Sequence, residues 1–139
     1  MSHLTTVQTE FRDPEAIKAA AKALGIEVVA NAKARFYMGF SDTCDLVLKL
    51  PGRYDLGLKR NDTGTYSFVC DEELLGGRYG SDGYGRSDAG RKAIGEEGRR
   101  LKQEYAFALL QAEARRKGRQ IQRQELPNGR IRVVMTGGR

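Results

Sequence analysis

The alternation of hydrophobic and polar residues is clearest between residues 44 and 70. Hydrophobic side chains recur at every second position in 44–50, 54–58 and 66–70. Turn-forming residues separate these runs, Pro-Gly-Arg at 51–53 and Asn-Asp-Thr-Gly at 61–64. Period-two patterns bounded by such turns are typical of half-buried strands. The sequence therefore predicts a three-stranded antiparallel meander.

The second turn also fixes the register of the meander. A three-residue loop with Gly64 in the left-handed conformation pairs Leu58 with Phe68. This register keeps the hydrophobic residues on one face, whereas a four-residue loop would place a serine opposite Leu58. Because a whole strand separates Cys44 from Cys70, we expect no disulfide between them.

Further strands are predicted on both sides of the meander. Residues 3–11, 26–29 and 35–40 carry short strand-like runs. Near the end, Pro-Asn-Gly at 127–129 joins residues 119–126 to residues 130–135, and Asn-Gly between such runs indicates a hairpin.

Helical periodicity appears in two segments. The first follows Asp13-Pro14, a capping residue and a good first helical residue, and ends at Gly25. Its buried stripe is predicted to be Ile17, Ala20, Ala21 and Leu24. The second, long helix follows the Gly-rich segment, with Asp88 as its candidate cap. Gly95 and Gly98 weaken its first turns, and it is predicted most clearly from Arg99 to Lys117, ending at Gly118. Its stripe is predicted to be Leu101, Tyr105, Ala108, Leu109 and Ala112.

These elements predict one α+β domain spanning residues 1–139. Most links between strands are short, so the sheet should be mainly antiparallel, in the order β-α-β-β-β-β-β-α-β-β. Both amphipathic helices need a partner for their hydrophobic stripes, and we expect them on one face of the sheet.

Charge divides the chain near residue 75. Residues 1–75 carry 9 Lys/Arg and 11 Asp/Glu, whereas residues 76–139 carry 15 and 7, within a net charge of +6. Eight of the 17 glycines lie between Gly76 and Gly98. Such glycine density disfavours regular structure, and we predict a mobile Gly/Arg-rich loop at 76–90.

Composition indicates the class of protein and its location. With 40% hydrophobic and 30% charged residues, the chain is globular. There is no run near the ~20 hydrophobic residues that a membrane span requires, and no signal peptide is recognisable at the N-terminus. We expect a soluble, cytoplasmic protein that does not bind membranes.

Catalytic and cofactor motifs are not recognisable. The single histidine, His3, lies next to the N-terminus, and the neighbouring carboxylates at 71–73 and 96–97 point in different directions. The run 85–92 has the glycine spacing of a phosphate-binding loop, but Arg91 and Lys92 occupy the positions of the required Lys and Ser/Thr. We predict no enzyme activity, no cofactor and no metal.

A basic surface is the better-supported feature. Cations and two tyrosines gather on the loop, the long helix and the hairpin, where they could bind a polyanion or stack on bases. The candidate residues are Arg78, Tyr79, Tyr84, Arg86, Arg91, Lys92, Arg99, Arg115, Arg116, Lys117, Arg119, Arg123, Arg130 and Arg132.

Four segments resemble one protein family. They are residues 1–9 (MSHLTTVQT), 54–58 (YDLGL), 105–107 (YAF) and 128–134 (NGRIRVV). Together they resemble the domain of unknown function 1257, which includes the hypothetical chloroplast reading frame 35 proteins of plastids and cyanobacteria. The resemblance covers residues 1–135 and departs at 75–98. It implies no catalytic residues, because the family has no established activity. Some bacterial and phage relatives are encoded near AAA-type ATPases, so the resemblance implies such a system as a partner.

Two functions follow as expectations. The first is a non-enzymatic accessory or adaptor protein whose basic C-terminal half binds an acidic protein. The alternative is a nucleic-acid-binding protein that uses the same loop, helix and hairpin. Steep weakening of binding by salt would favour the alternative.

Overall fold

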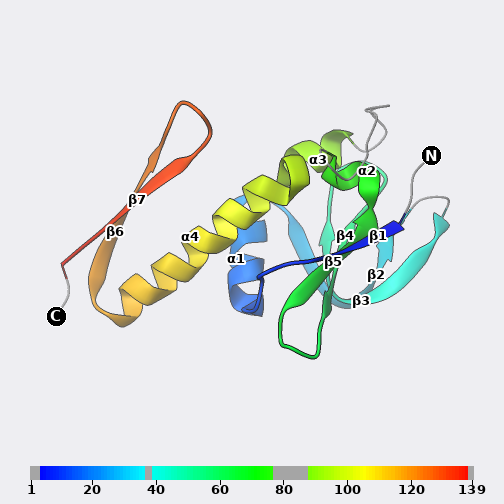
Figure 1. The fold of residues 1–139 in the computed structure, drawn as a ribbon, viewed down its shortest axis with the longest axis horizontal. Helices are drawn as coiled ribbons and strands as arrows, with labels where there is room; N and C mark the ends of the chain where they lie inside the picture. Colours follow the sequence, from blue (N-terminus) through cyan, green and yellow to red (C-terminus); the bar gives the residue numbers. More distant parts are fainter. Residues whose placement is uncertain (1–3, 37–38, 77–87, 138–139) are drawn as a thin grey trace.

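A five-stranded antiparallel sheet forms the body of the protein, in the order β1-β5-β4-β3-β2 (Figure 1). The computed structural model describes residues 4–36, 39–76 and 88–137. The predicted α+β class with a mainly antiparallel sheet is confirmed. The strands are β1 (Leu4–Gln8), β2 (Glu27–Arg35), β3 (Ser41–Lys49), β4 (Leu56–Arg60) and β5 (Tyr66–Asp71).

The meander has the predicted register. Leu58 pairs with Phe68, and the Asn61 amide donates to the Thr65 carbonyl over 2.7 Å. Gly64 has a φ of 88°, as a three-residue loop with a left-handed glycine requires.

The edge strand β2 differs from the prediction. A single strand runs from Glu27 to Arg35, where two strands at 26–29 and 35–40 were predicted. The chain instead turns after β2, where the Phe36 amide donates to the Phe40 carbonyl over 2.8 Å and Gly39 has a φ of 76°. Asn31, with a φ of 49°, marks a local irregularity that strand β2 tolerates.

Two helices cover one face of the sheet, as predicted. Helix α1 (Pro14–Ala23) is capped by Asp13, whose carboxylate accepts the Glu15 amide over 2.9 Å. Its Ile17 is buried in the same hydrophobic cluster as Leu101 of α4 (Arg99–Arg116). That cluster also holds Leu46, Leu48, Leu56, Leu58 and Phe68 of the sheet.

Tyr105 ties α4 to the segment before α1. Its ring stacks on Phe11 with centroids 4.2 Å apart. Its hydroxyl accepts the Arg12 and Asp13 amides over 2.8 and 3.1 Å. The first half of α4 is therefore anchored to the body.

The opposite face of the sheet carries a smaller hydrophobic cluster that includes Cys44. Cys44 was predicted to share a face with Leu46, which is wrong, because Leu46 belongs to the helix-covered cluster. The change of face occurs opposite Asn31. Ala30 pairs with Leu46 and Ala32 pairs with Cys44, but Asn31 and Asp45 between them do not pair. Cys44 and Cys70 are both buried, free thiols in different clusters, and burial raises the pKa of each.

Short helical segments precede α4; the one that begins at Asp88 was predicted, and the one at 72–75 was not. Helices α2 (Glu72–Leu75) and α3 (Asp88–Ile94) and the turn η3 (Glu96–Gly98) precede α4. Helix α3 also overlaps the end of the range 76–90 for which no regular structure was predicted, while residues 77–87 lie outside the described part. Gly95 and Gly98 have φ values of 83° and 73° and separate α3 from α4. These glycines interrupt the helical structure between α3 and α4, as the low helix propensity of glycine indicates.

The C-terminal hairpin forms a separate two-stranded sheet of β6 (Arg119–Glu125) and β7 (Ile131–Gly137). Figure 1 shows it apart from the five-stranded sheet, following the far end of α4. Its contacts with Gln103 and Glu104 bring it back to the first half of that helix. Leu109 and Ala112 were predicted to be buried, which is wrong: both are exposed, Leu109 by 39%. The helix has left the sheet by this point, and the hairpin packs on another part of its surface.

Candidate functional site

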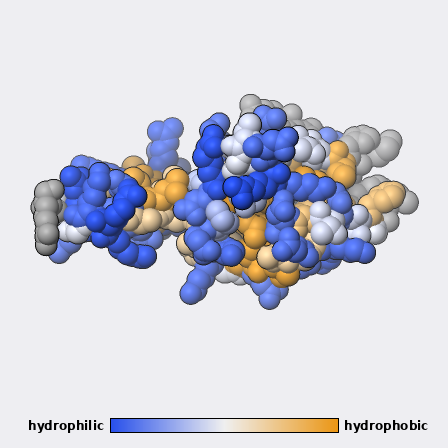
Figure 2. Space-filling view, turned by 90° about the horizontal axis from the view of Figure 1, so that it is seen from below, coloured by the Kyte–Doolittle hydropathy of each residue, from blue (hydrophilic) through white to orange (hydrophobic). Residues whose placement is uncertain are grey.

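The part of the molecule that stands apart from the sheet is the strongest candidate for a binding site. We call residues 109–137 the arm: the second half of α4 together with β6 and β7. The arm contains seven Lys/Arg and two Asp/Glu, so its net charge of +5 accounts for most of the +6 of the whole chain. Figure 2 shows it as a narrow extension with mostly hydrophilic side chains toward its end and hydrophobic ones near the body.

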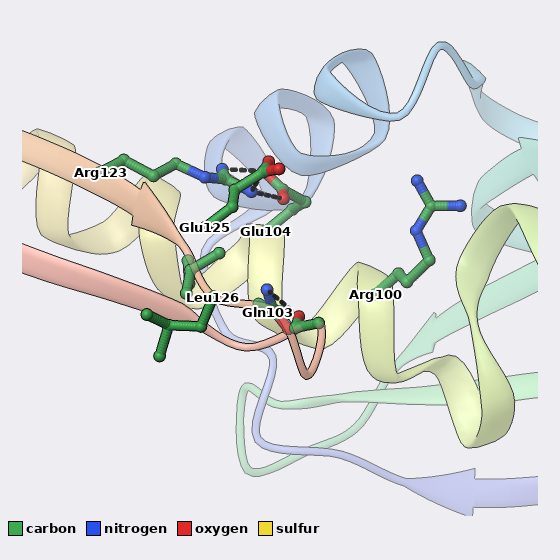
Figure 3. A pocket seen from close by; sticks show the side chains of 8 residues that line it. Arg100, Gln103, Glu104, Arg123, Glu125 and Leu126 are labelled. Atoms are coloured by element: carbon green, nitrogen blue, oxygen red, sulfur yellow. Dashed lines mark hydrogen bonds and ion pairs between the residues drawn. The ribbon is translucent and has the colours of Figure 1, made fainter.

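One ion pair holds the hairpin on α4 (Figure 3). Arg123 of β6 donates from Nη1 to Glu104 Oε1 over 2.7 Å, and its Nη2 donates to Oε2. The Glu104 side chain is only 11% exposed and that of Arg123 only 25%. The hydrogen bonds that Arg123 donates to the Glu104 carboxylate raise the pKa of Arg123. This two-pronged contact fixes the orientation of β6 along the helix.

Two further contacts extend the attachment. The Arg123 guanidinium lies 4.7 Å from the ring centroid of Phe107, within the range of a cation–π interaction. At the hairpin turn, Gln103 Nε2 donates to the Gly129 carbonyl over 3.2 Å. The hairpin is thus attached to α4 at two places, at Arg123 in the middle of β6 and at the turn.

A cavity of about 300 Å³ lies between α4 and the hairpin (Figure 3). Its principal charged groups, Glu104 and Arg123, are engaged with each other. The lining residues are Arg100, Gln103, Glu104, Arg123, Glu125, Leu126, Gly129 and Ile131. Because its most buried charged groups, Glu104 and Arg123, are already paired with each other, the cavity is better explained as part of the attachment than as a reactive centre.

The predicted basic residues fall into two groups, where the sequence analysis expected one surface. Arg91, Lys92 and Arg99 lie on α3 and at the start of α4, whereas the others lie at the far end of α4 and on the hairpin. Helix α4 has 18 residues, so Arg99 lies about 27 Å along its axis from Arg116. Arg130, by contrast, follows Gly129, whose carbonyl contacts Gln103 in the first half of α4. Arg78, Tyr79, Tyr84 and Arg86 lie outside the described residues.

Internal ion pairs engage some of the predicted cations. Arg123 was predicted as a partner-binding residue, but its side chain is bound to Glu104. Arg116 and Lys117 both contact Glu113, Lys117 Nζ at 2.7 Å from Oε1. Four exposed arginines of the arm make no ion pair within the described part of the chain. They are Arg115, Arg119, Arg130 and Arg132.

Sequence reasoning missed the role of Glu104, although a signal for it exists. On the face of the hairpin that is partly buried, Arg123 is in line with Ile121 on β6 and pairs with Val133 of β7. A charged residue in an otherwise hydrophobic row needs an internal partner of opposite charge. The buried-face position of Glu104, next to Tyr105, supplies it.

Two other carboxylates are fully inaccessible: that of Asp71, which accepts the Glu73 amide over 3.1 Å, and that of Asp55, which serves the fold. Arg35 donates to it from Nε and from Nη2, the latter over 2.8 Å, and Lys49 Nζ lies 3.4 Å away. Burial alone would raise the pKa of Asp55, but the hydrogen bonds and charge of Arg35 outweigh it and lower the pKa. The site joins the end of β2 to the start of β4 and leaves no oxygen directed at a ligand.

The described part of the chain shows neither a metal-binding cluster nor a membrane-spanning helix. No group of three or more His, Cys, Asp or Glu side chains gathers there in a way that could hold a metal ion. Among the same residues, no helix combines the length and the hydrophobic character needed to cross a membrane.

The comparison with known proteins confirms the resemblance seen in the sequence. The family described as "Protein of unknown function (DUF1257)" matches residues 20–134. The chain is 27% identical to the "Uncharacterized protein ycf35" of Cyanophora paradoxa, over 97% of this chain and 96% of that protein. No solved structure matches.

Proposed function

This chain belongs to the DUF1257 family of proteins of unknown function, and we propose that it is a non-catalytic accessory protein whose arm binds a negatively charged macromolecule. The observation that carries this proposal is the concentration of exposed, internally unpaired arginines on an element that stands away from the body. Positive charge presented in this way attracts polyanions and accelerates their association.

The internal ion pairs support the same conclusion. Glu104 and Glu113 are engaged by Arg123, Arg116 and Lys117, so the negative charges of this region are neutralised by its own cations. Glu125 lies 3.8 Å from Arg123. The remaining arginines of the arm are exposed and make no ion pair with another described residue.

The non-catalytic part of the proposal rests on the state of two buried carboxylates, those of Asp55 and Glu104. Asp55 accepts hydrogen bonds from Arg35, and Glu104 accepts two from Arg123. A general acid or base must reach a substrate proton, and both groups are occupied by internal donors.

The test compares two triple variants of the full chain. The arm variant carries Arg115→Gln, Arg119→Gln and Arg130→Gln. The matched control neutralises three exposed cations of the body, through Lys22→Gln, Lys33→Gln and Arg53→Gln. The two variants lose the same charge, so any difference in binding reports on location.

Binding to fluorescent heparin and to a 20-base-pair DNA duplex is measured by anisotropy as a function of salt. The arm variant should bind both probes at least about tenfold more weakly, with a smaller salt slope for DNA, roughly 0.9 for each lost phosphate contact. The body variant should bind within about twofold of the natural sequence. Equal losses in the two variants, or no binding of either probe by the natural sequence, would refute the proposal.

A further inference from the structure

The two faces of the β6–β7 hairpin differ sharply in chemistry. On one face, the cross-strand pairs Ile121–Met135 and Arg123–Val133 are partly buried. This is the face whose Arg123 reaches Glu104 on α4. Because neighbouring strand residues alternate between faces, the intervening pairs point away from the helix.

The outer face consists of three cross-strand pairs, all exposed. They are Gln120–Thr136, Gln122–Val134 and Gln124–Arg132. Three of the six side chains are glutamines, which both donate and accept hydrogen bonds. None is a carboxylate, although the chain as a whole contains 18 Asp/Glu.

Cations flank this row at both ends. Arg119 begins β6 and follows Arg115 at the end of α4, while Arg130 lies in the turn before β7. The hairpin thus presents a strip of three glutamines, with Thr136, Val134 and Arg132 beside them, between positive ends. An acidic protein surface would be matched by the cations alone and would leave the glutamine strip without specified partners.

We propose that the outer face of the β6–β7 hairpin enters the major groove of B-form duplex DNA, with the flanking arginines on the phosphates. This inference rests on the proposed function of the arm and names its partner class. A two-stranded ribbon fits a groove about 12 Å wide. The span from Gln120 to Gln124 is about 14 Å at roughly 3.4 Å per residue, the length of about four base-pair steps.

The side chains match the groove edges of the bases. Glutamine can form a pair of hydrogen bonds to adenine, arginine can do so to guanine, and an aliphatic side chain such as Val134 can contact the thymine methyl group. The major groove of A-form RNA is too deep and narrow for such a ribbon. The geometry therefore distinguishes DNA from RNA as well as from an acidic protein.

The test uses two double variants and four probes. The variant Gln122→Ala with Gln124→Ala removes outer-face hydrogen bonds and leaves the charge unchanged. Its control, Gln8→Ala with Gln111→Ala, removes the same chemistry from positions outside the hairpin. The probes are a 20-base-pair DNA duplex, the RNA duplex of the same sequence, heparin and poly-glutamate, each at about 150 mM salt.

We expect the natural sequence to bind the DNA duplex more tightly than the other three probes. The hairpin variant should bind DNA about tenfold or more weakly, in keeping with the discrimination that one well-formed base contact provides, and heparin unchanged. The control variant should bind both as the natural sequence does. A selection from duplexes with six randomised base pairs should recover adenine-containing sites with the natural sequence and lose this preference with the hairpin variant.

The outcomes separate the inference from the proposed function. If DNA, RNA and heparin bind with equal affinity, or if the hairpin variant binds DNA normally, the groove model is overturned while polyanion binding by the arm stands. Tighter binding of poly-glutamate than of DNA would overturn it in favour of an acidic protein. Loss of heparin binding in the arm variant, together with weaker DNA binding but normal heparin binding in the hairpin variant, supports both proposals.

Discussion

The attachment of the hairpin to α4 can be weakened by a substitution that preserves shape. Glu104→Gln removes one negative charge but keeps an oxygen that can accept a hydrogen bond from Arg123. In the natural sequence this side chain accepts two such bonds in a largely buried position. The substitution therefore leaves a guanidinium, 25% exposed and beside Phe107, with an incomplete partner.

The magnitude follows from these contacts. A hydrogen bond to a charged group contributes about 1.5–3 kcal/mol, and one acceptor survives. We expect the hairpin to dock about 2–3 kcal/mol more weakly. Since an isolated two-stranded hairpin is marginally stable in water, docking governs how often its backbone opens, and its opening constant should rise about 30- to 140-fold.

Native-state hydrogen exchange measures this directly. Amides of β6 and β7 should lose protection by that factor, while amides of β3 and β4 in the body should keep theirs, because the opening is local. Adding Arg123→Gln to Glu104→Gln should recover part of the loss, since no unpaired charge then remains. Unchanged exchange in the hairpin, or equal losses in hairpin and body, would show that this ion pair does not hold the arm.

Two further predictions concern the body. Leu101→Ala should lower the free energy of unfolding by about 2–5 kcal/mol, because Leu101 is completely buried. The exposed Leu109 should matter less, and Leu109→Ala should lower it by about 1 kcal/mol or less. Denaturant titration of both variants checks this, and equal losses would contradict the assigned helix face. The folded state lowers the pKa of Asp55 below its ordinary 3.8, so its stabilisation is present above about pH 4 and lost as pH falls through the lowered value. Asp55→Asn should cost about 3–5 kcal/mol at pH 7 by leaving Arg35 and Lys49 without their carboxylate, and the difference between variant and natural sequence should shrink between pH 6 and pH 2; a constant difference would show that Asp55 is not the group responsible.

Features set by neighbouring residues could be predicted from the sequence. The cap at Asp13, the left-handed Gly64 and the Leu58–Phe68 register all depend on short-range rules of backbone geometry and alternation. The break between α3 and α4 likewise follows from the conformational cost of helical glycine.

Features that depend on distant segments could not be predicted. Whether the final hairpin joins the main sheet depends on the direction in which α4 leaves the body, which local pattern does not encode. The same direction decides that Leu109 is exposed and that Glu104 meets Arg123. For the candidate site, the sequence identified the basic residues, but their separation into two groups and the internal pairing of Arg123 required the three-dimensional arrangement.

The position of β1 beside β5 has a consequence for how the chain acquires its structure. Strands β2 to β5 can zip together in succession, because each pairs with the next. Strand β1 must wait, since Val7 pairs with Phe68 and the intervening chain has to be ordered or looped first. On the ribosome, the earliest of the strands to be synthesised is therefore expected to be the last to dock, and until residues 66–71 emerge it remains available to chaperones.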